Sequence, residues 1–313
     1  MAGTERGAVL ICGPTASGKS ALALELAREA RGVVINADSM QVYAGLRILT
    51  NRPVPEEEAA VPHRLYGFRS LSEPYSTALW LADVKEALAE AERQGWLPII
   101  VGGTGLYFKA LTEGLSDIPE IPPEIRECYR LAAQSQPAET LHAELARRDP
   151  ATAARLRPSD PQRIVRALEV LEATGRPLAD WQGKKQPPFL PLAQTYPFTQ
   201  ALSREELYRR CDARFETMLA NGAIEEARAV AALGLDPALP AMRAVGLPPL
   251  LAHLRGELSL DEAAAAAKTA TRNYAKRQLT WIRGNFRSWI TFDTQVMQRT
   301  KDEINSLLRK RLT

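Results

Sequence analysis

The feature that most constrains this chain is a glycine-rich segment near its N-terminus that fits the pattern G-x-x-x-x-G-K-[ST]. Its residues are Gly13, Pro14, Thr15, Ala16, Ser17, Gly18, Lys19 and Ser20. The apolar residues 8–12 before it are typical of a buried parallel strand, and residues 21–30 after it are strong helix formers. This strand–loop–helix order is the context that the pattern requires. Backbone N–H groups and the helix N-terminus would cradle a phosphate chain, Lys19 would add a charge, and Ser20 would offer a hydroxyl to Mg²⁺.

Length and composition are those of an ordinary globular protein. The chain has 313 residues, 25% charged and 45% hydrophobic, which is enough for one large domain and an insertion or extension. We find no bilayer-spanning run and no signal-peptide stretch, so we expect a cytoplasmic protein that does not contact a membrane. The three cysteines and three histidines are scattered, which argues against disulfides and against a histidine-rich metal site.

Positive charge gathers near the C-terminus, although the net charge is only +3. Between Glu262 and Asp293 there is no acidic residue, while the basic residues there are Lys268, Arg272, Lys276, Arg277, Arg283 and Arg287. Such a stretch is either a surface for a phosphate backbone or a solvated helix face, and charge alone does not decide between them.

Strand and helix signals alternate through the first third of the chain. We predict strands at 8–12, 32–37 and 97–101, and a helix at 76–94. This alternation is typical of an α/β fold, a P-loop parallel sheet flanked by helices. Because ligands bind beyond the carboxyl ends of such strands, the turns after them are the functional candidates. They are the phosphate loop, the turn of Asp38, Ser39, Met40 and Gln41, and the turn of Gly102, Gly103, Thr104 and Gly105.

From about Asp117 the pattern changes to helices without strands. We predict helices at 123–135, 137–148 and 161–174, the last with Asp160 as N-cap and Pro161 in its first turn. The expected division is a P-loop catalytic core of residues 1–117 and 195–313 with an all-helical insertion, 118–194. In the rest of the core we predict strands at 194–201 and 289–292 and helices at 203–220, 260–283 and 296–311. Ser203 with Glu206, and Ser259 with Glu262, fit capping boxes.

Three polar groups could carry chemistry or recognition, and each has a plainer alternative. Asp38 is either a general base beside the phosphates or a helix N-cap or outer Mg²⁺ ligand. The turn around Thr104 either supplies a hydroxyl to the site or only reverses the chain. The helix with Gln162, Arg163 and Arg166 either binds RNA or forms a solvated face paired with acidic neighbours.

Two absences argue against nucleoside triphosphate hydrolysis. The sequence contains no Asn-Lys-x-Asp or Thr-Lys-x-Asp segment of the kind that reads guanine. The strand at 97–101 ends in glycines rather than in the Asp that holds Mg²⁺ in many such enzymes.

Five segments, taken in order, resemble the tRNA dimethylallyltransferase (tRNA isopentenyltransferase) family. They are residues 13–20, 36–43, 101–111, 160–170 and 275–281, so the resemblance extends over nearly the whole chain. It implies transfer of the dimethylallyl group of dimethylallyl diphosphate to N6 of the adenosine 3′ of a tRNA anticodon.

The resemblance also implies roles for individual residues. Asp38 would be the base, Thr104 would hydrogen-bond at the reacting centre, and the phosphate loop would hold the diphosphate with Arg214 and a Mg²⁺ ion on Ser20. The tRNA anticodon stem-loop would be clamped by the insertion, and we expect a monomer. The implied tRNA contacts are Asp38, Ser39, Met40, Gln41, Thr104, Arg126, Gln162, Arg163, Ile164, Val165, Arg166, Lys276, Arg277, Gln278 and Arg283.

Two segments depart from the family pattern. Gly246, Leu247, Pro248 and Pro249 stand where relatives usually have Gly-Tyr-Arg-Gln, which removes a polar group facing tRNA. Thr50, Asn51, Arg52 and Pro53 replace Thr-Ala-Lys-Pro and keep a cation.

Other functions remain as alternatives: a P-loop small-molecule kinase, an RNA-binding protein without catalysis, or prenylation of free adenine nucleotides. The kinase is opposed by the lack of a lid-like arginine cluster close to the loop and by the basic C-terminal third.

Overall fold

The computed structural model describes residues 7–183, 185–293 and 306 and divides the chain into two compact units. The first comprises Met1–Thr112 and Phe189–Thr313, and the second comprises Glu113–Pro188. The helix predicted at 296–311 lies outside the described residues apart from residue 306.

A six-stranded parallel sheet forms the centre of the first unit, in the order β3-β2-β4-β1-β5-β6. The strands are β1 (Ala8–Cys12), β2 (Gly32–Asn36), β3 (His63–Arg64), β4 (Leu97–Gly102), β5 (Thr195–Ala201) and β6 (Ile290–Asp293). The predicted α/β fold is therefore confirmed. The two-residue strand β3 was not predicted, because a strand this short leaves no periodic signal.

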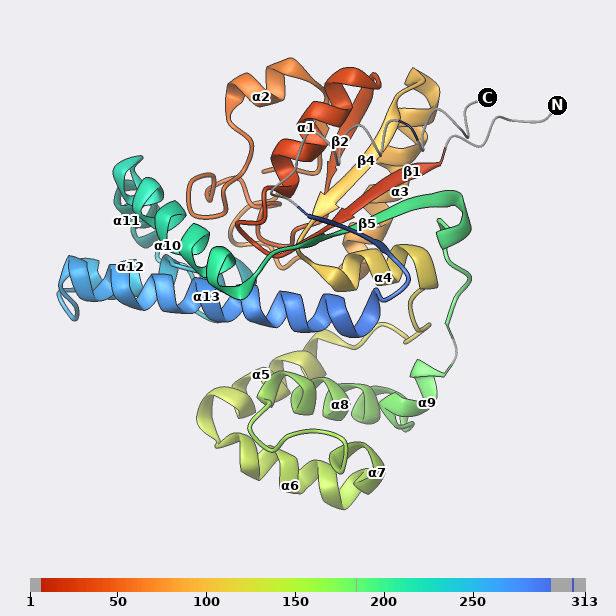
Figure 1. The fold of residues 1–313 in the computed structure, drawn as a ribbon. Helices are drawn as coiled ribbons and strands as arrows, with labels where there is room; N and C mark the ends of the chain where they lie inside the picture. The colour runs from red at the N-terminus through yellow and green to blue at the C-terminus, as the bar shows by residue number, and fades with distance from the viewer. Residues whose placement is uncertain (1–6, 184, 294–305, 307–313) are drawn as a thin grey trace. The chain divides into compact units, whose positions relative to one another are not determined.

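Helices cover both faces of this sheet (Figure 1). They include α1 (Lys19–Glu29), α3 (Thr77–Gln94) and α4 (Gly105–Glu113), whereas α2 (Pro55–Ala60) lies in the connection between β2 and β3 and has no buried residue. Side chains of β1 alternate: Val9 and Ile11 pack with α1, while Leu10 and Cys12 pack with α3 and α4 on the other face. Because both faces are covered, every residue of β1 is buried, as the continuous apolar run predicts.

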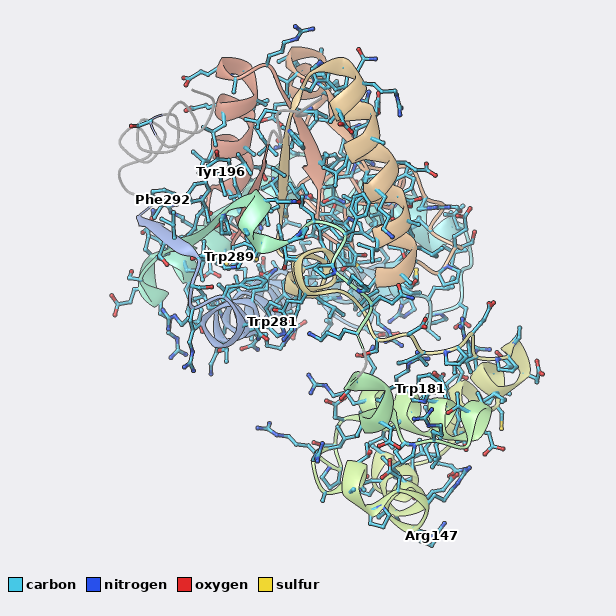
Figure 2. All side chains as sticks on the ribbon, turned by 90° about the vertical axis from the view of Figure 1, so that its right-hand side faces the viewer. Arg147, Trp181, Tyr196, Trp281, Trp289 and Phe292 are labelled. Carbon is cyan, nitrogen blue, oxygen red and sulfur yellow. The ribbon has the colours of Figure 1, made fainter. Side chains whose placement is uncertain are left out.

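The second part of this unit adds four helices and a separate core. They are α10 (Arg204–Ala220), α11 (Ala223–Ala232), α12 (Leu247–Leu254) and α13 (Leu260–Asn285), with short 3-10 turns at Leu192–Gln194 and Pro240–Arg243. Phe215, Met218 and Leu250 belong to their shared core. The C-terminal end of α13 returns to the sheet, where Trp281 contacts Phe286 and Phe286 stacks on Trp289 with ring centroids 4.0 Å apart (Figure 2).

The start of α13 follows the predicted capping box. The Ser259 hydroxyl accepts from the Glu262 N–H, and the Glu262 carboxylate accepts from the Ser259 N–H at 2.8 Å. At α10 only the first of these two bonds forms, from the Glu206 N–H to Ser203. The Glu206 carboxylate binds the guanidinium groups of Arg209 and Arg210 instead.

The second unit is helical. Its helices are α5 (Pro123–Ser135), α6 (Ala138–Arg148), α7 (Pro150–Ala153), α8 (Pro161–Thr174) and α9 (Leu178–Gln182). Asp160 caps α8 by accepting from the Arg163 N–H at 3.3 Å, and Pro161 occupies the first turn, as predicted. The core of this unit includes Tyr129, Leu141, Leu145 and Leu168.

Candidate active site

The phosphate loop joins β1 to α1 through two residues in the left-handed backbone region. Ala16 and Gly18 have positive φ angles, 63° and 90°, and the Ser17 N–H donates to the Pro14 carbonyl. Gly18 precedes the helix without a capping side chain, so the N–H groups of the first turn are free for an anion. The Lys19 ammonium donates to the Pro14 carbonyl at 3.1 Å and thus lies over the loop.

Two glutamine side chains from distant segments hold this loop. The Ser17 hydroxyl donates to Oε1 of Gln200 at the end of β5, at 2.5 Å. The Thr15 N–H donates to Oε1 of Gln278 on α13, at 2.8 Å. A Cβ at Gly13 would lie within 3.0 Å of both Ser17 Oγ and Gln200 Oε1, so glycine is required for this packing.

A charged cavity of about 390 Å³ lies beside the loop. Its lining includes four cationic side chains, those of Lys19, Arg209, Arg210 and Arg214. Arg214 also donates to the Thr15 hydroxyl. This concentration of positive charge and free N–H groups suits a phosphate chain with several negative charges.

The burial of these cations lowers their pKa values. Burial reduces the pKa of Lys19 to about 8, with Arg214 lowering it further and Asp38 opposing the shift. Burial also lowers the pKa of Arg214. Two desolvated cations that repel each other would be stabilised by a bound anion.

Asp38 follows β2 and is held by a buried neighbour. The side chain of Asn36 accepts from the Asp38 N–H at 2.8 Å and donates to the Asp38 carbonyl at 2.9 Å. Oδ1 of Asp38 accepts from the Met40 N–H at 2.9 Å, which closes a turn. Asp38 therefore terminates a strand rather than capping a helix, since no helix begins in the residues that follow it until α2.

The Gly102–Gly103–Thr104–Gly105 turn packs against the other two turns. The Thr104 N–H donates to the Ala37 carbonyl, and the Thr104 hydroxyl accepts from the Ser39 N–H at 3.0 Å. The Gly13 N–H donates to the Gly102 carbonyl, and a Cβ at Gly102 would lie 2.0 Å from the Ala37 oxygen. The three turns singled out by the sequence therefore meet at one sheet edge.

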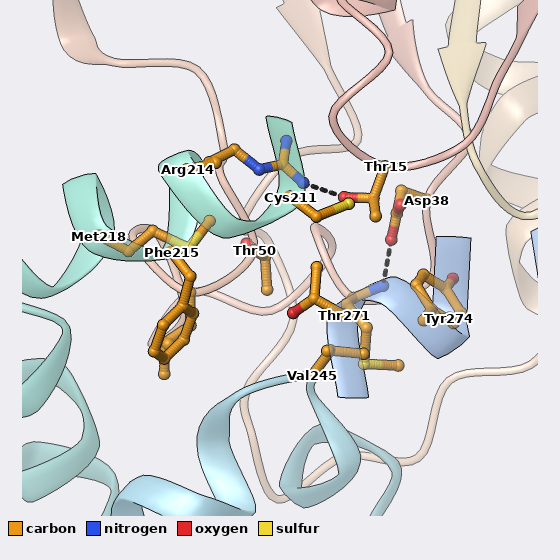
Figure 3. Close-up of a pocket in the computed structure, with 12 residues that line it drawn as sticks. Thr15, Asp38, Thr50, Cys211, Arg214, Phe215, Met218, Val245, Thr271 and Tyr274 are labelled. Atoms are coloured by element: carbon orange, nitrogen blue, oxygen red, sulfur yellow. Dashed lines mark hydrogen bonds between the residues drawn. The ribbon is translucent and has the colours of Figure 1, made fainter. Parts of the chain in front are cut away.

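A second, smaller cavity adjoins these turns (Figure 3). It has a volume of about 50 Å³. Its lining is Thr15, Asp38, Met40, Leu49, Thr50, Cys211, Arg214, Phe215, Met218, Val245, Thr271 and Tyr274. Arg214 thus lines both cavities. The smaller one, which we call the apolar cavity after the Leu49, Phe215 and Met218 part of its wall, also has polar side chains in its wall, among them Thr15, Asp38 and Thr50.

The predicted tRNA contacts on α13 include three exposed basic residues and one buried glutamine. Lys276, Arg277 and Arg283 are exposed. Gln278 is buried, and its side-chain amide donates to the Gly103 carbonyl at 2.9 Å while accepting from Thr15. Gln278 therefore links two turns of the site. Near it, Ser39, Met40 and Gln41 are partly exposed.

The remaining predicted contacts lie on the helical unit. Arg126, Gln162 and Arg163 are exposed, while Val165 and Arg166 are partly exposed. Arg163 pairs with Asp160 at 3.4 Å, and Arg166 pairs with Glu169 at 3.4 Å. Ile164 is fully buried in the core of the unit, so its side chain packs internally.

Ser20 is an exposed residue in the first turn of α1 and lines the charged cavity. Among the described residues no group of three or more His, Cys, Asp or Glu side chains could hold a metal. Mg²⁺ usually keeps several waters and binds through one or two protein groups together with phosphate oxygens. The residues therefore fit a Mg²⁺ ion that arrives with a phosphate chain.

Several residues of the site were not predicted: Gln200, Arg209, Arg210, Phe215 and Tyr274. Arg210 and Arg214 are four apart on the predicted helix 203–220, a spacing that indicates one helix face. The argument that no arginine cluster lies close to the loop is wrong, because folding brings α10 beside it. Phe215 carries no sequence signal, since an apolar residue on a helix equally indicates core.

Among the described helices, none is long and apolar enough to cross a membrane.

Known proteins resemble the chain over most of its length. Residues 41–285 match the sequence pattern of the IPP transferase family. Two relatives called tRNA dimethylallyltransferase, from Bradyrhizobium strains ORS 278 and BTAi1, are 59% and 60% identical over 276 residues. The matched region covers 88% of this chain and 90% of each relative.

Solved structures agree with these relatives. The tRNA isopentenylpyrophosphate transferase from Bacillus halodurans is 32% identical with a TM-score of 0.69, covering 98% of both chains. A eukaryotic dimethylallyltransferase acting on tRNA is 28% identical with a TM-score of 0.77, covering 92% of this chain and 73% of that one. The chain is therefore a transferase and belongs to the IPP transferase family, together with the tRNA dimethylallyltransferases.

Proposed function

We propose that this chain transfers the dimethylallyl group of dimethylallyl diphosphate to N6 of the adenosine 3′ of a tRNA anticodon and releases diphosphate. The observation that carries the proposal is the pair of cavities that share Arg214. A cationic cavity beside a small one whose wall is partly apolar matches a donor with a charged head and a short apolar tail.

The phosphate loop would hold the head of this donor. The free N–H groups in the first turn of α1, together with Lys19 and Arg214, would stabilise the charge that develops on the departing oxygen. A Mg²⁺ ion on Ser20, when bound, would neutralise further charge on the diphosphate. Arg209 and Arg210 would draw the anion into the cavity.

Asp38 would act as the base at the other end of the reaction. The C1–O bond to diphosphate breaks, a bond from N6 to C1 forms, and the N6 proton moves to the Asp38 carboxylate. The proposal is supported by the position of Asp38 in the wall of the apolar cavity, close to Thr15 of the loop (Figure 3). The Thr104 hydroxyl, which accepts a hydrogen bond from the Ser39 N–H, would form a hydrogen bond at the reacting centre.

The exposed and partly exposed cations would bind the anticodon stem-loop, whose target adenosine must leave its stack to reach Asp38. On the first unit these are Lys276, Arg277 and Arg283, and on the helical unit Arg126, Arg163 and Arg166. The helical unit would then serve as a clamp on RNA. We expect the enzyme to act in the cytoplasm as a monomer.

Labelled dimethylallyl diphosphate, offered with unmodified tRNA, with AMP and with ATP in separate reactions, tests this function. We expect label in tRNA alone. Label in AMP or ATP would indicate prenylation of free nucleotides. Phosphoryl transfer from ATP to a small molecule, with no label in tRNA, would indicate a kinase and contradict the proposal.

A further inference from the structure

On the side away from Thr15 and Asp38, side chains of α10 form part of the wall of the apolar cavity. Figure 3 shows Thr15 and Asp38 on one side and Phe215 and Met218, both from α10, on the opposite side. The diphosphate and the nucleophile would approach from the Thr15 and Asp38 side. The tail of a donor would therefore run toward Phe215 and Met218.

We propose that Phe215 and Met218 set the length of the allylic group that this enzyme transfers, admitting a five-carbon tail and excluding a ten-carbon one. The inference rests on the proposed function and adds the residues that determine donor specificity.

The size of the cavity supports this limit. One water requires roughly 10–15 Å³ of such space, so a cavity of about 50 Å³ offers room for roughly three to five water-sized groups. A branched five-carbon tail fits this space with small adjustments. A tail of twice that length does not fit unless the wall moves.

The wall that would have to move is firmly packed. Phe215 is 2% exposed and Met218 is 9% exposed, and both belong to the core shared by α10–α13. A Cβ at Gly246 would lie 2.9 Å from a ring atom of Phe215, so the backbone of residue 246 packs directly against the ring. Closely packed interiors do not yield readily to added methylenes.

Two substitutions test the proposal by opening the wall. Phe215→Leu and Met218→Ala remove different amounts of side chain. If one of the two variants does not fold, the other still tests the proposal. Leu219→Ala is the matched control, because Leu219 lies on the same helix, packs against the same core and does not line this cavity. Thermal unfolding of each protein establishes that it is folded.

The measurement is kcat/KM for transfer to an anticodon stem-loop from dimethylallyl diphosphate and from geranyl diphosphate, with products distinguished by mass. One added methylene in an apolar pocket changes kcat/KM by about 10- to 200-fold. We expect the wild type to use only the shorter donor. In either opened variant the ratio of longer to shorter donor should rise at least about tenfold, and in Leu219→Ala it should not change.

The other outcomes separate the two proposals. If folded variants keep dimethylallyl transfer with an unchanged ratio, or if the wild type uses both donors equally, the length limit is wrong and the function stands. If the wild type transfers neither group to RNA, both the proposed function and the proposed length limit are wrong.

Discussion

Asp38 owes its position to a buried asparagine two residues earlier. Asn36 bonds both backbone polar groups of Asp38, and the Trp80 indole N–H donates to the Asn36 carbonyl at 2.8 Å. The carboxylate is therefore fixed by strand β2 and its packing before any substrate binds. Such pre-positioning is what a general base requires.

Replacing Asp38 should lower turnover and leave RNA binding largely intact. We expect kcat to fall by about 10²-fold or more in both Asp38→Ala and Asp38→Asn. The asparagine retains an acceptor for the Met40 N–H, so it separates basicity from the turn. Normal turnover in Asp38→Asn would show that the side chain only shapes the turn.

Lys19 should make donor binding depend on pH. Its pKa is lowered to about 8 in the free protein, and a bound diphosphate favours the charged form and so raises that pKa. Above pH 8 binding must therefore take up a proton, and affinity should fall by up to about tenfold per pH unit until the pKa of the complex is reached. Equilibrium binding of dimethylallyl diphosphate checks this.

Lys19→Met is the companion variant for that experiment. It should bind the donor weakly at all pH values and lose the alkaline dependence. A wild-type affinity that stays constant through the alkaline range would contradict the assignment of Lys19 to the diphosphate.

Most elements of the first unit could be predicted because their periodicity and ends are marked in the sequence. Strands β1, β2 and β4 are continuous apolar runs, and Ser203 and Ser259 mark two helix starts. Helix α4 was not predicted, because it begins within a glycine-rich turn without a capping side chain. Helix α12 starts at Leu247 with two prolines, which suit a first turn but look like a helix breaker in sequence.

Helix α13 contributes more to the site than its charge suggests. Gln278 joins the phosphate loop to the turn at Gly103, and a Cβ at Gly103 would lie 2.1 Å from its amide nitrogen. The sequence indicates only a polar residue in a basic stretch. To predict that Gln278 links the two turns, one would have to know which loops α13 packs against. The periodicity of the sequence does not give this information.

Gln278→Ala should raise KM for dimethylallyl diphosphate, because the Thr15 N–H and the Gly103 carbonyl both lose their partner. Each unsatisfied buried group costs about 1–3 kcal/mol. Asn273→Ala, at an exposed position on the same helix, is the control. Steady-state kinetics with varied donor measures the effect. If Gln278→Ala weakens tRNA binding and leaves KM for the donor unchanged, the residue contacts RNA rather than ordering the loops.

Helices α8 and α13 should each contribute to the RNA surface. For Arg163→Ala and for Lys276→Ala we expect weaker tRNA binding and a salt slope reduced by about 1. Arg147→Ala removes an exposed cation of α6 that is not part of the proposed surface. Binding measured across a series of salt concentrations distinguishes them. Equal slopes in all three variants would remove Arg163 and Lys276 from the interface.

At the scale of the whole molecule, the site joins segments that lie far apart in sequence. The phosphate loop lies at residues 13–20, whereas Arg209, Arg210 and Arg214 follow the helical unit in the chain. The sequence singles out the loop and Asp38, the candidate base, because both follow strands directly. It cannot identify the arginines or the walls of the apolar cavity, because tertiary packing alone brings α10 to them.

The central claim is that the phosphate loop holds a departing diphosphate while Asp38 receives the N6 proton. The most direct test is a crystal structure with an unreactive dimethylallyl diphosphate analogue and an anticodon stem-loop. We predict the diphosphate on residues 13–20, the tail toward Phe215, and N6 of the unstacked adenosine about 2.6–3.2 Å from an Asp38 oxygen. An ATP γ-phosphate on the loop aimed at a small metabolite, with the RNA bound elsewhere, would contradict the claim.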